Sequence, residues 1–319
     1  MSAPSRPTAA SASDWRVHAV LLTIQVVFST LPVATKLVLP VIEPLAVATL
    51  RIFGSALAFA VVKWARTREQ VTAPRDLLAF VGLALLGVAL NQVLFLLGVA
   101  RTTAVHANIL ITIIPVFTLA VALALGRERV SGAKLGGIVL AGAGALYLIA
   151  ARNLRSEGAT ALGDGLVAVN AFFYACYLVL SKDLLRRYSP ITVVTYVFFF
   201  GALLVAPVGV PALLRTDLAA VTTRTWLILA YIVAFPSFLA YLLSIWALRR
   251  TASSLVAMYV YVQPLVTAVT APLVLGERVT QRAGLAGALI FAGLALATWG
   301  EQVAGRQLGE AFRPPAEGA

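Results

Sequence analysis

Two stretches of this chain, PVFTLAVALALGRERV at residues 115–130 and PLVTAVTAPLVLGERV at residues 264–279, repeat one pattern at an offset of 149 residues. Each begins with a proline inside an apolar run and ends with Glu-Arg-Val. The agreement extends through residues 101–149 and 250–298. An offset of 146 aligns earlier parts of the chain, pairing Lys36 with Lys182, Pro44 with Pro190 and Phe53 with Phe199. Since prolines and charges agree in register, we interpret the chain as one structural unit present twice.

The composition indicates a protein that lies mostly inside a membrane. Of 319 residues, 61% are hydrophobic and only 12% are charged, which excludes a water-soluble globular enzyme. A helix needs about 20 apolar residues to cross a hydrocarbon core of about 30 Å. Ten apolar segments meet that need, at residues 17–39, 44–64, 77–99, 104–125, 132–151, 163–183, 191–213, 225–247, 253–275 and 282–300. We therefore predict an all-α integral membrane protein with ten transmembrane helices.

The ten segments divide into two repeats of five, residues 15–151 and 161–300. Residues 1–14 are rich in Ser, Ala and Pro, and residues 301–319 are polar, so we expect both to be disordered tails. Because five is an odd number of crossings, the second copy must enter the membrane from the opposite side. The copies are therefore predicted to be inverted repeats, related by a pseudo-two-fold axis in the membrane plane.

The basic residues predict the orientation of the chain. With the N-terminus in the cytoplasm, sixteen of the 25 Lys and Arg residues fall on the cytoplasmic side and eight on the other, with Arg51 inside a span. Cytoplasmic loops of membrane proteins carry such an excess, so both tails are expected in the cytoplasm. The same bias accounts for the net charge of +12 without a nucleic-acid partner, because no basic run with interleaved aromatic residues is present.

Short motifs in both halves resemble those of a known transporter family. The P…GRERV and P…LGERV stretches each end one span and precede a Gly/Ala-rich one, and the first and sixth spans end in Thr-Lys and Ser-Lys. In these features the chain is similar to the ten-span, two-repeat EamA-type family of the drug/metabolite transporter superfamily. The resemblance implies a central cavity between the repeats, alternating access, and transport of amino acids, other metabolites or drugs, with export as the favoured direction.

The sequence lacks the residue clusters that are typical of enzymes and metalloproteins. Its one cysteine is Cys176, its two histidines are His18 and His106, and all thirteen acidic residues fall in tails, loops or span ends. Hydrolysis or group transfer inside a membrane needs a positioned acid, base or metal. We therefore predict no catalytic residue, no bound metal and no cofactor. Any proton or cation coupling would have to use a group at a span end.

Arg51 is the one charged residue well inside a span, about 10 Å from the start of the second span at about 1.5 Å per residue. It can face the cavity and bind a carboxylate or phosphate group of a substrate. Alternatively, it can extend toward the membrane surface or bind backbone carbonyls, and so hold the second span to a neighbour. Both interpretations stay open, and Arg51 is the first candidate for substrate binding.

Other polar residues recur at helical spacing and predict which helix faces line a cavity. Lipid cannot satisfy an amide, so Asn and Gln inside spans must face protein or water. Residues four or seven apart return to nearly the same side of a helix, whereas a lone hydroxyl often bonds its own backbone. The further candidates for substrate binding are Asn91, Gln92, Asn108, Thr112, Asn170, Tyr174, Tyr177, Tyr241, Tyr259 and Gln263.

Two repeat-related pairs are candidates for a gating or structural role. Pro115 and Pro264 each interrupt a span, and a proline there can shape the cavity or only fix a kink needed for packing. Glu128 and Glu277 each end a span, on opposite predicted sides of the membrane. They can form ion pairs that open alternately, or hold a turn by accepting hydrogen bonds from backbone N–H groups at a helix end.

These observations predict a multi-pass transporter of the bacterial inner membrane. The lack of acids inside the spans and the abundance of Tyr, Asn and Gln favour a neutral or zwitterionic substrate such as an amino acid. The alternatives are efflux of drugs or cationic compounds, and a membrane protein without transport activity, such as a receptor. The predicted partners are a small-molecule substrate and the lipid bilayer, while the oligomeric state stays open and a monomer fits the sequence.

Overall fold

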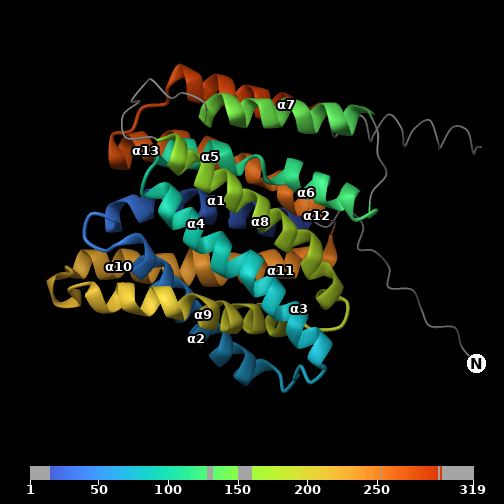
Figure 1. Cartoon of the computed structure of the whole chain (residues 1–319), viewed down its shortest axis with the longest axis vertical. Helices are drawn as coiled ribbons and strands as arrows, with labels where there is room; N and C mark the ends of the chain where they lie inside the picture. Colours follow the sequence, from blue (N-terminus) through green and yellow to red (C-terminus); the bar gives the residue numbers. More distant parts are fainter. Residues whose placement is uncertain (1–14, 128–131, 150–159, 252, 294, 297–319) are drawn as a thin grey trace, which may run out of the picture.

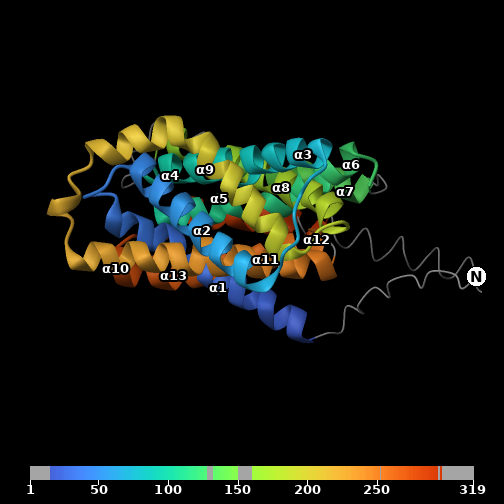
Figure 2. The same ribbon diagram turned by 90° about the horizontal axis from the view of Figure 1, so that it is seen from below.

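The computed structural model describes residues 15–127, 132–149, 160–251, 253–293 and 295–296. Those residues form helices joined by short turns, with no strand among them, so the all-α class is confirmed. The helices run alongside one another in a flattened bundle (Figure 1, Figure 2). Both predicted tails, residues 1–14 and 301–319, lie outside the described residues.

Eight helical stretches of the described chain are long and apolar enough to cross a membrane. Within the first half they are α1 (Trp15–Val38), α2 (Pro44–Arg66), α3–η1–α4 (Pro74–Ala84, Leu85–Leu90, Asn91–Val99) and α5–α6 (Ala104–Ile111, Ile114–Ala124). Within the second half they are α8 (Ala161–Leu185), α9 (Pro190–Arg215), α10–η3–α11 (Thr223–Ile232, Val233–Leu239, Ala240–Arg250) and α12–η4–α13 (Ser253–Met258, Tyr259–Tyr261, Val262–Leu275). A short 3-10 turn, η2 (Leu218–Ala220), joins α9 to α10. The predicted limits of these spans differ from the helix ends by at most three residues.

The two remaining predicted spans are described only in part. They correspond to α7 (Gly132–Ile149), with an apolar stretch at Leu135–Tyr147, and to a helix at residues 281–293. The two helices lie side by side along one edge of the bundle (Figure 1). A Cβ added at Gly144 would lie 3.0 Å from the Ala286 carbonyl oxygen, and one at Gly293 would lie 2.6 Å from that of Gly137. Glycine therefore allows the two backbones to approach closely.

Four of the eight spans are interrupted, at positions that the repeat relates. The wider π-helical turns of η1 and η3 replace the α-helix at Leu85–Leu90 and Val233–Leu239, so residues 85–90 align with residues 234–239 at the offset of 149. The α5–α6 span breaks at Thr112 and Ile113, and its counterpart narrows to the 3-10 turn η4. Such irregular backbone is tolerated at membrane depth where it is buried in protein or lines a cavity.

Helices from the two halves of the chain are interleaved in space. α2 packs along α9, α4 along α8, and α1 along α11 and α13. Two glycines allow the closest crossings: a Cβ added at Gly87 would lie 2.3 Å from the ring of Tyr177, and one at Gly209 would lie 2.1 Å from Thr49 Oγ1. Any side chain at either position would push a pair of helices apart, so these contacts hold the core around the cavity described below.

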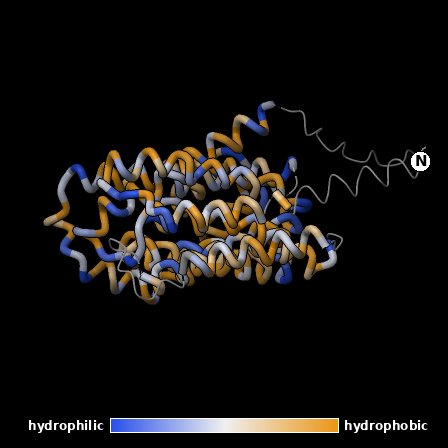
Figure 3. The backbone as a smooth tube through the Cα atoms, turned by 90° about the horizontal axis from the view of Figure 1, so that it is seen from above, coloured by the Kyte–Doolittle hydropathy of each residue, from blue (hydrophilic) through white to orange (hydrophobic). Residues whose placement is uncertain are grey.

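Apolar residues dominate the length of the helices, while hydrophilic residues collect near the two ends of the bundle (Figure 3). Several large apolar side chains lie on the outside, among them Leu57, Leu78 and Leu273, which are 68%, 73% and 80% exposed. Such exposure to water is unfavourable, whereas a hydrocarbon core covers it. Charged groups at the helix ends pair instead, as Arg215 does with Glu43 at 3.2 Å. These features are those of a multi-pass membrane protein.

Candidate functional site

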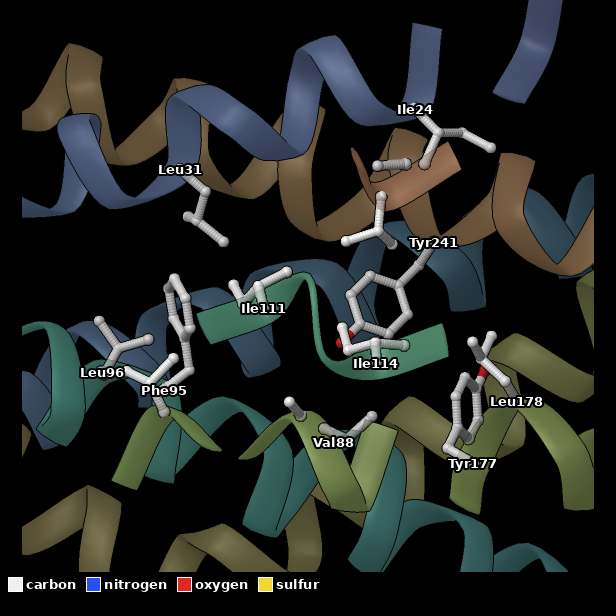
Figure 4. Close-up of a cluster of buried hydrophobic side chains, with 14 of the residues drawn as sticks. Ile24, Leu31, Val88, Phe95, Leu96, Ile111, Ile114, Tyr177, Leu178 and Tyr241 are labelled. Carbon is white, nitrogen blue, oxygen red and sulfur yellow. The ribbon is translucent and has the colours of Figure 1, made fainter. Parts of the chain in front are cut away.

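A cavity of about 60 Å³ lies among α1, α2, α4, α5, α6, α8, α11 and α13, between the two halves of the chain. Its lining combines buried polar groups with an apolar wall. The polar residues and tyrosines are Arg51, Asn91, Gln92, Asn170, Tyr174, Tyr241 and Gln263, and the apolar residues are Phe28, Leu31, Phe95, Ile111 and Ile114. Seven of the eleven residues predicted to bind substrate therefore line one cavity. Figure 4 shows Leu31, Phe95, Ile111, Ile114 and Tyr241 around the same opening.

Arg51 lies on the buried face of α2 and is only 2% exposed. Its Nε donates a hydrogen bond to Ser237 Oγ at 3.0 Å, and that hydroxyl donates in turn to the Ile232 carbonyl oxygen at 2.9 Å. Its Nη1 has no partner. Among the ion pairs between described residues, none gives Arg51 a carboxylate. A buried guanidinium in this state is costly, and an anionic ligand in the cavity would relieve the cost.

Gln92 and Tyr241 hold equivalent places in the two halves, each two residues after the end of its π-helical segment, η1 or η3. Both line the cavity. Neither the oxygen nor the nitrogen of the Gln92 amide has a partner, although the residue is only 1% exposed. A buried amide without hydrogen bonds is unfavourable by about 1–3 kcal/mol. The amide of Gln92 is therefore available to a ligand in the cavity that Arg51 also lines.

A hydrogen-bonded network holds three other residues of the lining, Asn91, Asn170 and Tyr241. Asn170 Nδ2 donates to the Asn91 carbonyl oxygen at 2.6 Å, and Asn91 Nδ2 reaches the Asn170 carbonyl oxygen at 3.5 Å. The hydroxyl of Tyr241 donates to Asn91 Oδ1 at 2.9 Å, with the Gly87 carbonyl oxygen a second acceptor at 3.2 Å. These bonds join α4, α8 and α11 at the point where η1 ends. They position Asn91 and Tyr241 at the cavity.

Sequence reasoning missed several residues of the site. Gln25 is 2% exposed and accepts a hydrogen bond from Gln263 Nε2 at 2.6 Å, which holds the Gln263 side chain at the cavity. The signal for Gln25 was present, because it is an amide inside an apolar span, as Gln263 is. The apolar wall carried no such signal, since Phe, Leu and Ile occur throughout the spans.

The other four predicted substrate-binding residues lie away from the cavity lining. The Asn108 amide donates to the Ser29 carbonyl oxygen at 3.1 Å and to the hydroxyl of Thr267, so it joins α5 to α1 and α13. The Thr112 hydroxyl donates to its own helix at the Ile109 carbonyl oxygen. Tyr177 packs against Gly87 behind the cavity, and the hydroxyl of Tyr259 bonds the ring of His18.

Three of the four residues predicted to gate the transporter or to shape its spans, Pro115, Pro264 and Glu277, lie in the described part of the chain. Pro115 stands at the start of α6, just after the break at Thr112, and Pro264 stands near the start of α13, so each follows an interruption of its span. The carboxylate of Glu277 accepts hydrogen bonds from the backbone N–H groups of Ala104, at 2.9 Å, and of Val105, at 3.1 Å. These N–H groups belong to the start of α5 in the other half of the chain, so Glu277 caps that helix rather than its own turn, and a gating role for Glu277 stays a prediction. Glu128 lies outside the described residues.

A buried cluster of polar residues joins α5 and α8 beside Glu277. Asp164 is only 2% exposed; its Oδ1 accepts a hydrogen bond from the hydroxyl of Thr102, and its Oδ2 lies 3.1 Å from His106 Nδ1. The Thr160 hydroxyl and N–H, at the start of α8, both donate to the Arg101 carbonyl oxygen. The sequence placed Asp164 and His106 near span ends but did not show that they meet, because 58 residues separate them.

The other end of the bundle is held by side chains from the α2–α3 and α8–α9 connections. Asp76 pairs with Arg187 and accepts a hydrogen bond from the Tyr188 hydroxyl at 2.6 Å, which raises the pKa of Tyr188. Glu69 accepts hydrogen bonds from the N–H and the hydroxyl of Ser189, at 3.0 and 2.6 Å. Burial alone would raise the pKa of Glu69, but these bonds and the charge of Lys63 leave it lowered.

The lining of the cavity offers groups that can bind a small molecule. The described residues hold no group of three or more His, Cys, Asp or Glu side chains that could bind a metal ion. The lining offers one guanidinium, amides, tyrosines and an apolar wall, which suit a small molecule with an acidic group and an apolar part. A volume of about 60 Å³ is small beside ligand pockets of about 300–1,000 Å³, so the cavity must widen to admit such a molecule.

The chain is similar to known membrane proteins over most of its length. The model of the EamA-like transporter family matches residues 16–150 and 161–299. An uncharacterized transporter of Archaeoglobus fulgidus is 30% identical over 285 residues, covering 89% of this chain and 97% of that protein. A probable terminal-alkyne amino-acid exporter of Streptantibioticus cattleyicolor is 29% identical over 213 residues, with 66% and 69% covered. A solved crystal structure at 19% identity and a TM-score of 0.64 covers 90% of this chain and 98% of that one, so the fold is shared.

Proposed function

Because the chain belongs to the EamA-like transporter family, we propose that it moves a small organic molecule with a carboxylate group, such as an amino acid, across the membrane by alternating access. One observation carries the proposal: the guanidinium of Arg51 is buried at the central cavity with a free Nη1 and no carboxylate partner among the described residues. A planar guanidinium suits a carboxylate because it can donate two parallel hydrogen bonds to it.

The rest of the lining supports a substrate with a second, apolar part. Gln92 offers an amide without a hydrogen bond in the same cavity, while Phe28, Leu31 and Phe95 provide an apolar wall. The export direction rests on the likeness to a probable amino-acid exporter, which is 29% identical. Efflux of a cationic compound is the second candidate, but Arg51 would repel a cation at this site.

Alternating access would use the two five-span repeats, residues 15–151 and 161–300, in inverted orientation. The pairing of helices supports this architecture, because α1 packs along α11 as α4 packs along α8, and α1 packs along α13 as α6 packs along α8. When the two halves are exchanged, the contact of α1 with α11 becomes that of α8 with α4, and the contact of α1 with α13 becomes that of α8 with α6. The matched interruptions at η1 and η3 support it further. An even number of spans places both tails on the same side of the membrane, and the excess of basic residues assigns that side to the cytoplasm of a bacterial inner membrane.

The orientation can be tested by labelling single cysteines in intact cells. With Cys176 replaced by Ser, a cysteine at position 127 should be labelled only from the cytoplasm and a cysteine at position 278 only from outside, because the inverted repeat places these equivalent turns on opposite sides. Labelling of both positions from the same side would refute the inverted architecture.

The function is tested by uptake into liposomes that contain the purified protein. The panel comprises neutral amino acids, the matching amino-acid amides that lack the carboxylate, and cationic drugs, each with and without a pH gradient. We expect uptake of an amino acid above that of its amide and above that of empty liposomes. Preference for the amide or for the cationic drug would overturn the carboxylate assignment and favour cation efflux.

A further inference from the structure

A second cavity, of about 400 Å³, lies between α2 and α9 at the end of the bundle where the α2–α3 connection begins. Its polar end contains Lys63, Thr67, Arg68 and Gln70. Ala60 and Ala56 precede Lys63 by three and seven residues, so they continue the same face of α2 toward the middle of the membrane. The cavity is therefore a groove that is basic at the bundle end and apolar along its length, and we call it the α2–α9 groove.

The two basic residues of the α2–α9 groove form no ion pair with a carboxylate of the described residues. None of the ion pairs between described residues involves Lys63 or Arg68. The nearby carboxylate of Glu69 feels the charge of Lys63 but accepts hydrogen bonds from the N–H and hydroxyl of Ser189. Lys63 Nζ and Arg68 Cζ each lie 5.8 Å from an aromatic ring, those of Tyr196 and Trp64. Both cations therefore remain available to an anion.

The wall of the groove is held in place before any ligand binds. The hydroxyl of Tyr196 accepts a hydrogen bond from the Val71 N–H at 3.3 Å, and the Tyr196 ring packs 5.3 Å from that of Phe80. The Thr195 hydroxyl lies 2.7 Å from the Ile191 carbonyl oxygen of its own helix and 3.2 Å from the Phe59 carbonyl oxygen of α2, so its one proton has an acceptor on each helix. A site that is formed in advance loses less freedom on binding.

We propose that the α2–α9 groove binds an anionic phospholipid, with the headgroup phosphate between Lys63 and Arg68 and an acyl chain along Ala60, Ala56 and Phe199. A phospholipid fits because the groove is basic at one end and apolar along its length, and a phospholipid joins a phosphate to a long apolar chain. The excess of basic residues assigns this end of the bundle to the cytoplasmic leaflet, where anionic lipids are found. Trp64, 70% exposed at the rim, stands where aromatic residues contact the headgroup region.

A second groove in the described chain provides a contrast. It has a volume of about 440 Å³ between α1, α10 and α13, and its lining is almost entirely apolar, with Arg224 its one charged residue. It offers room for an acyl chain but no pair of cations for a phosphate. Anionic selectivity should therefore belong to the α2–α9 groove and not to lipid-facing grooves in general.

The experiment uses Trp64 as the reporter of a bound lipid. Trp15, Trp226, Trp246 and Trp299 are replaced by Phe, and the full chain is placed in nanodiscs of phosphatidylcholine that contain a small fraction of brominated phosphatidylglycerol or brominated phosphatidylcholine. Bromine quenches tryptophan fluorescence only at close range. We expect half-maximal quenching of Trp64 at a much lower fraction of the anionic lipid. Equal quenching by the two lipids would overturn the proposal.

Substitutions then locate the site. Each basic side chain near an anionic surface is worth about five-fold in binding, so K63Q/R68Q should weaken the preference for phosphatidylglycerol about 25-fold. The matched control is R66Q/R75Q, which removes two exposed cations from the same region but outside the groove. The control should lose much less of the preference than K63Q/R68Q, because its two side chains contribute only to the diffuse attraction of the surface. An equal loss of the preference in the two double variants would mean that the anionic lipid is attracted to the basic surface in general. Displacement of the lipid by millimolar inorganic phosphate would mean that the groove is a site for free anions. Either outcome refutes the lipid site. If K63Q/R68Q fails to fold, the comparison of the two lipids on the parent chain still decides the proposal.

Discussion

Replacing Arg51 by Gln should separate substrate binding from folding. In the unliganded protein, the change removes one charge-assisted hydrogen bond, from Nε to Ser237, worth about 1.5–3 kcal/mol. It also removes a buried cation without a counter-ion among the described residues, whose desolvation costs several kcal/mol. Ser237 keeps its own bond to the Ile232 carbonyl oxygen, so no polar atom is orphaned there. The free energy of unfolding should therefore stay equal or rise.

The same substitution should severely weaken substrate binding. Removing one partner of a buried, hydrogen-bonded charge pair costs about 2–5 kcal/mol, which corresponds to at least about a 30-fold increase in the dissociation constant. The assay is thermal unfolding of the purified protein, with and without the amino acid identified by liposome uptake. A ligand at 100 times its dissociation constant stabilises the wild-type protein by about 2.7 kcal/mol, and at the same ligand concentration that shift should fall to about 0.9 kcal/mol or less in R51Q.

The control for this experiment is R66Q, which removes an exposed arginine from the same helix and should leave both the stability and the ligand-induced shift unchanged. Two results would refute the reasoning. A large loss of stability in unliganded R51Q would mean that Arg51 serves to hold α2 to η3. An unchanged ligand-induced shift would mean that the carboxylate binds elsewhere.

Three further predictions concern the buried polar groups. Y241F should lower the free energy of unfolding by about 1–3 kcal/mol, because Asn91 Oδ1 loses its hydrogen-bond donor. Y261F removes a buried hydroxyl that has no hydrogen-bond partner, so it should not lower the free energy of unfolding. Equal effects of the two variants in thermal unfolding would contradict the network. D164N should destabilise the protein by about 1–3 kcal/mol by disturbing the contacts to Thr102 and His106, and wild-type thermal stability would show that the cluster carries no weight. Glu69 has a lowered pKa in the folded state, so its contribution to the free energy of unfolding is present above its ordinary pKa of 4.5 and is lost as the pH falls through the lowered pKa. E69Q should remove that part of the loss of stability in acid. Identical dependence of unfolding on pH in E69Q and the wild-type protein would refute the assignment.

The candidate site was partly predictable because amides and charges cannot be left on lipid. Arg51, Asn91, Asn170 and Gln263 were found by that reasoning, and all line the cavity. The reasoning fails where a polar residue is satisfied inside the protein instead. Asn108 satisfies the same rule by bonding Ser29 and Thr267, and no local pattern distinguishes a helix-joining amide from a ligand-binding one.

The sequence by itself determined the membrane class, the family and the limits of eight spans, because hydrophobic length and the repeated motifs are properties of contiguous segments. Only the tertiary structure decided which polar side chains meet. Asp164 contacts His106, which is 58 residues away in the sequence, and Gln263 donates a hydrogen bond to Gln25, which is 238 residues away. Such pairings depend on how each helix is rotated and where its π-helical turns fall, as at η1 and η3, and a pattern along one helix does not contain that information.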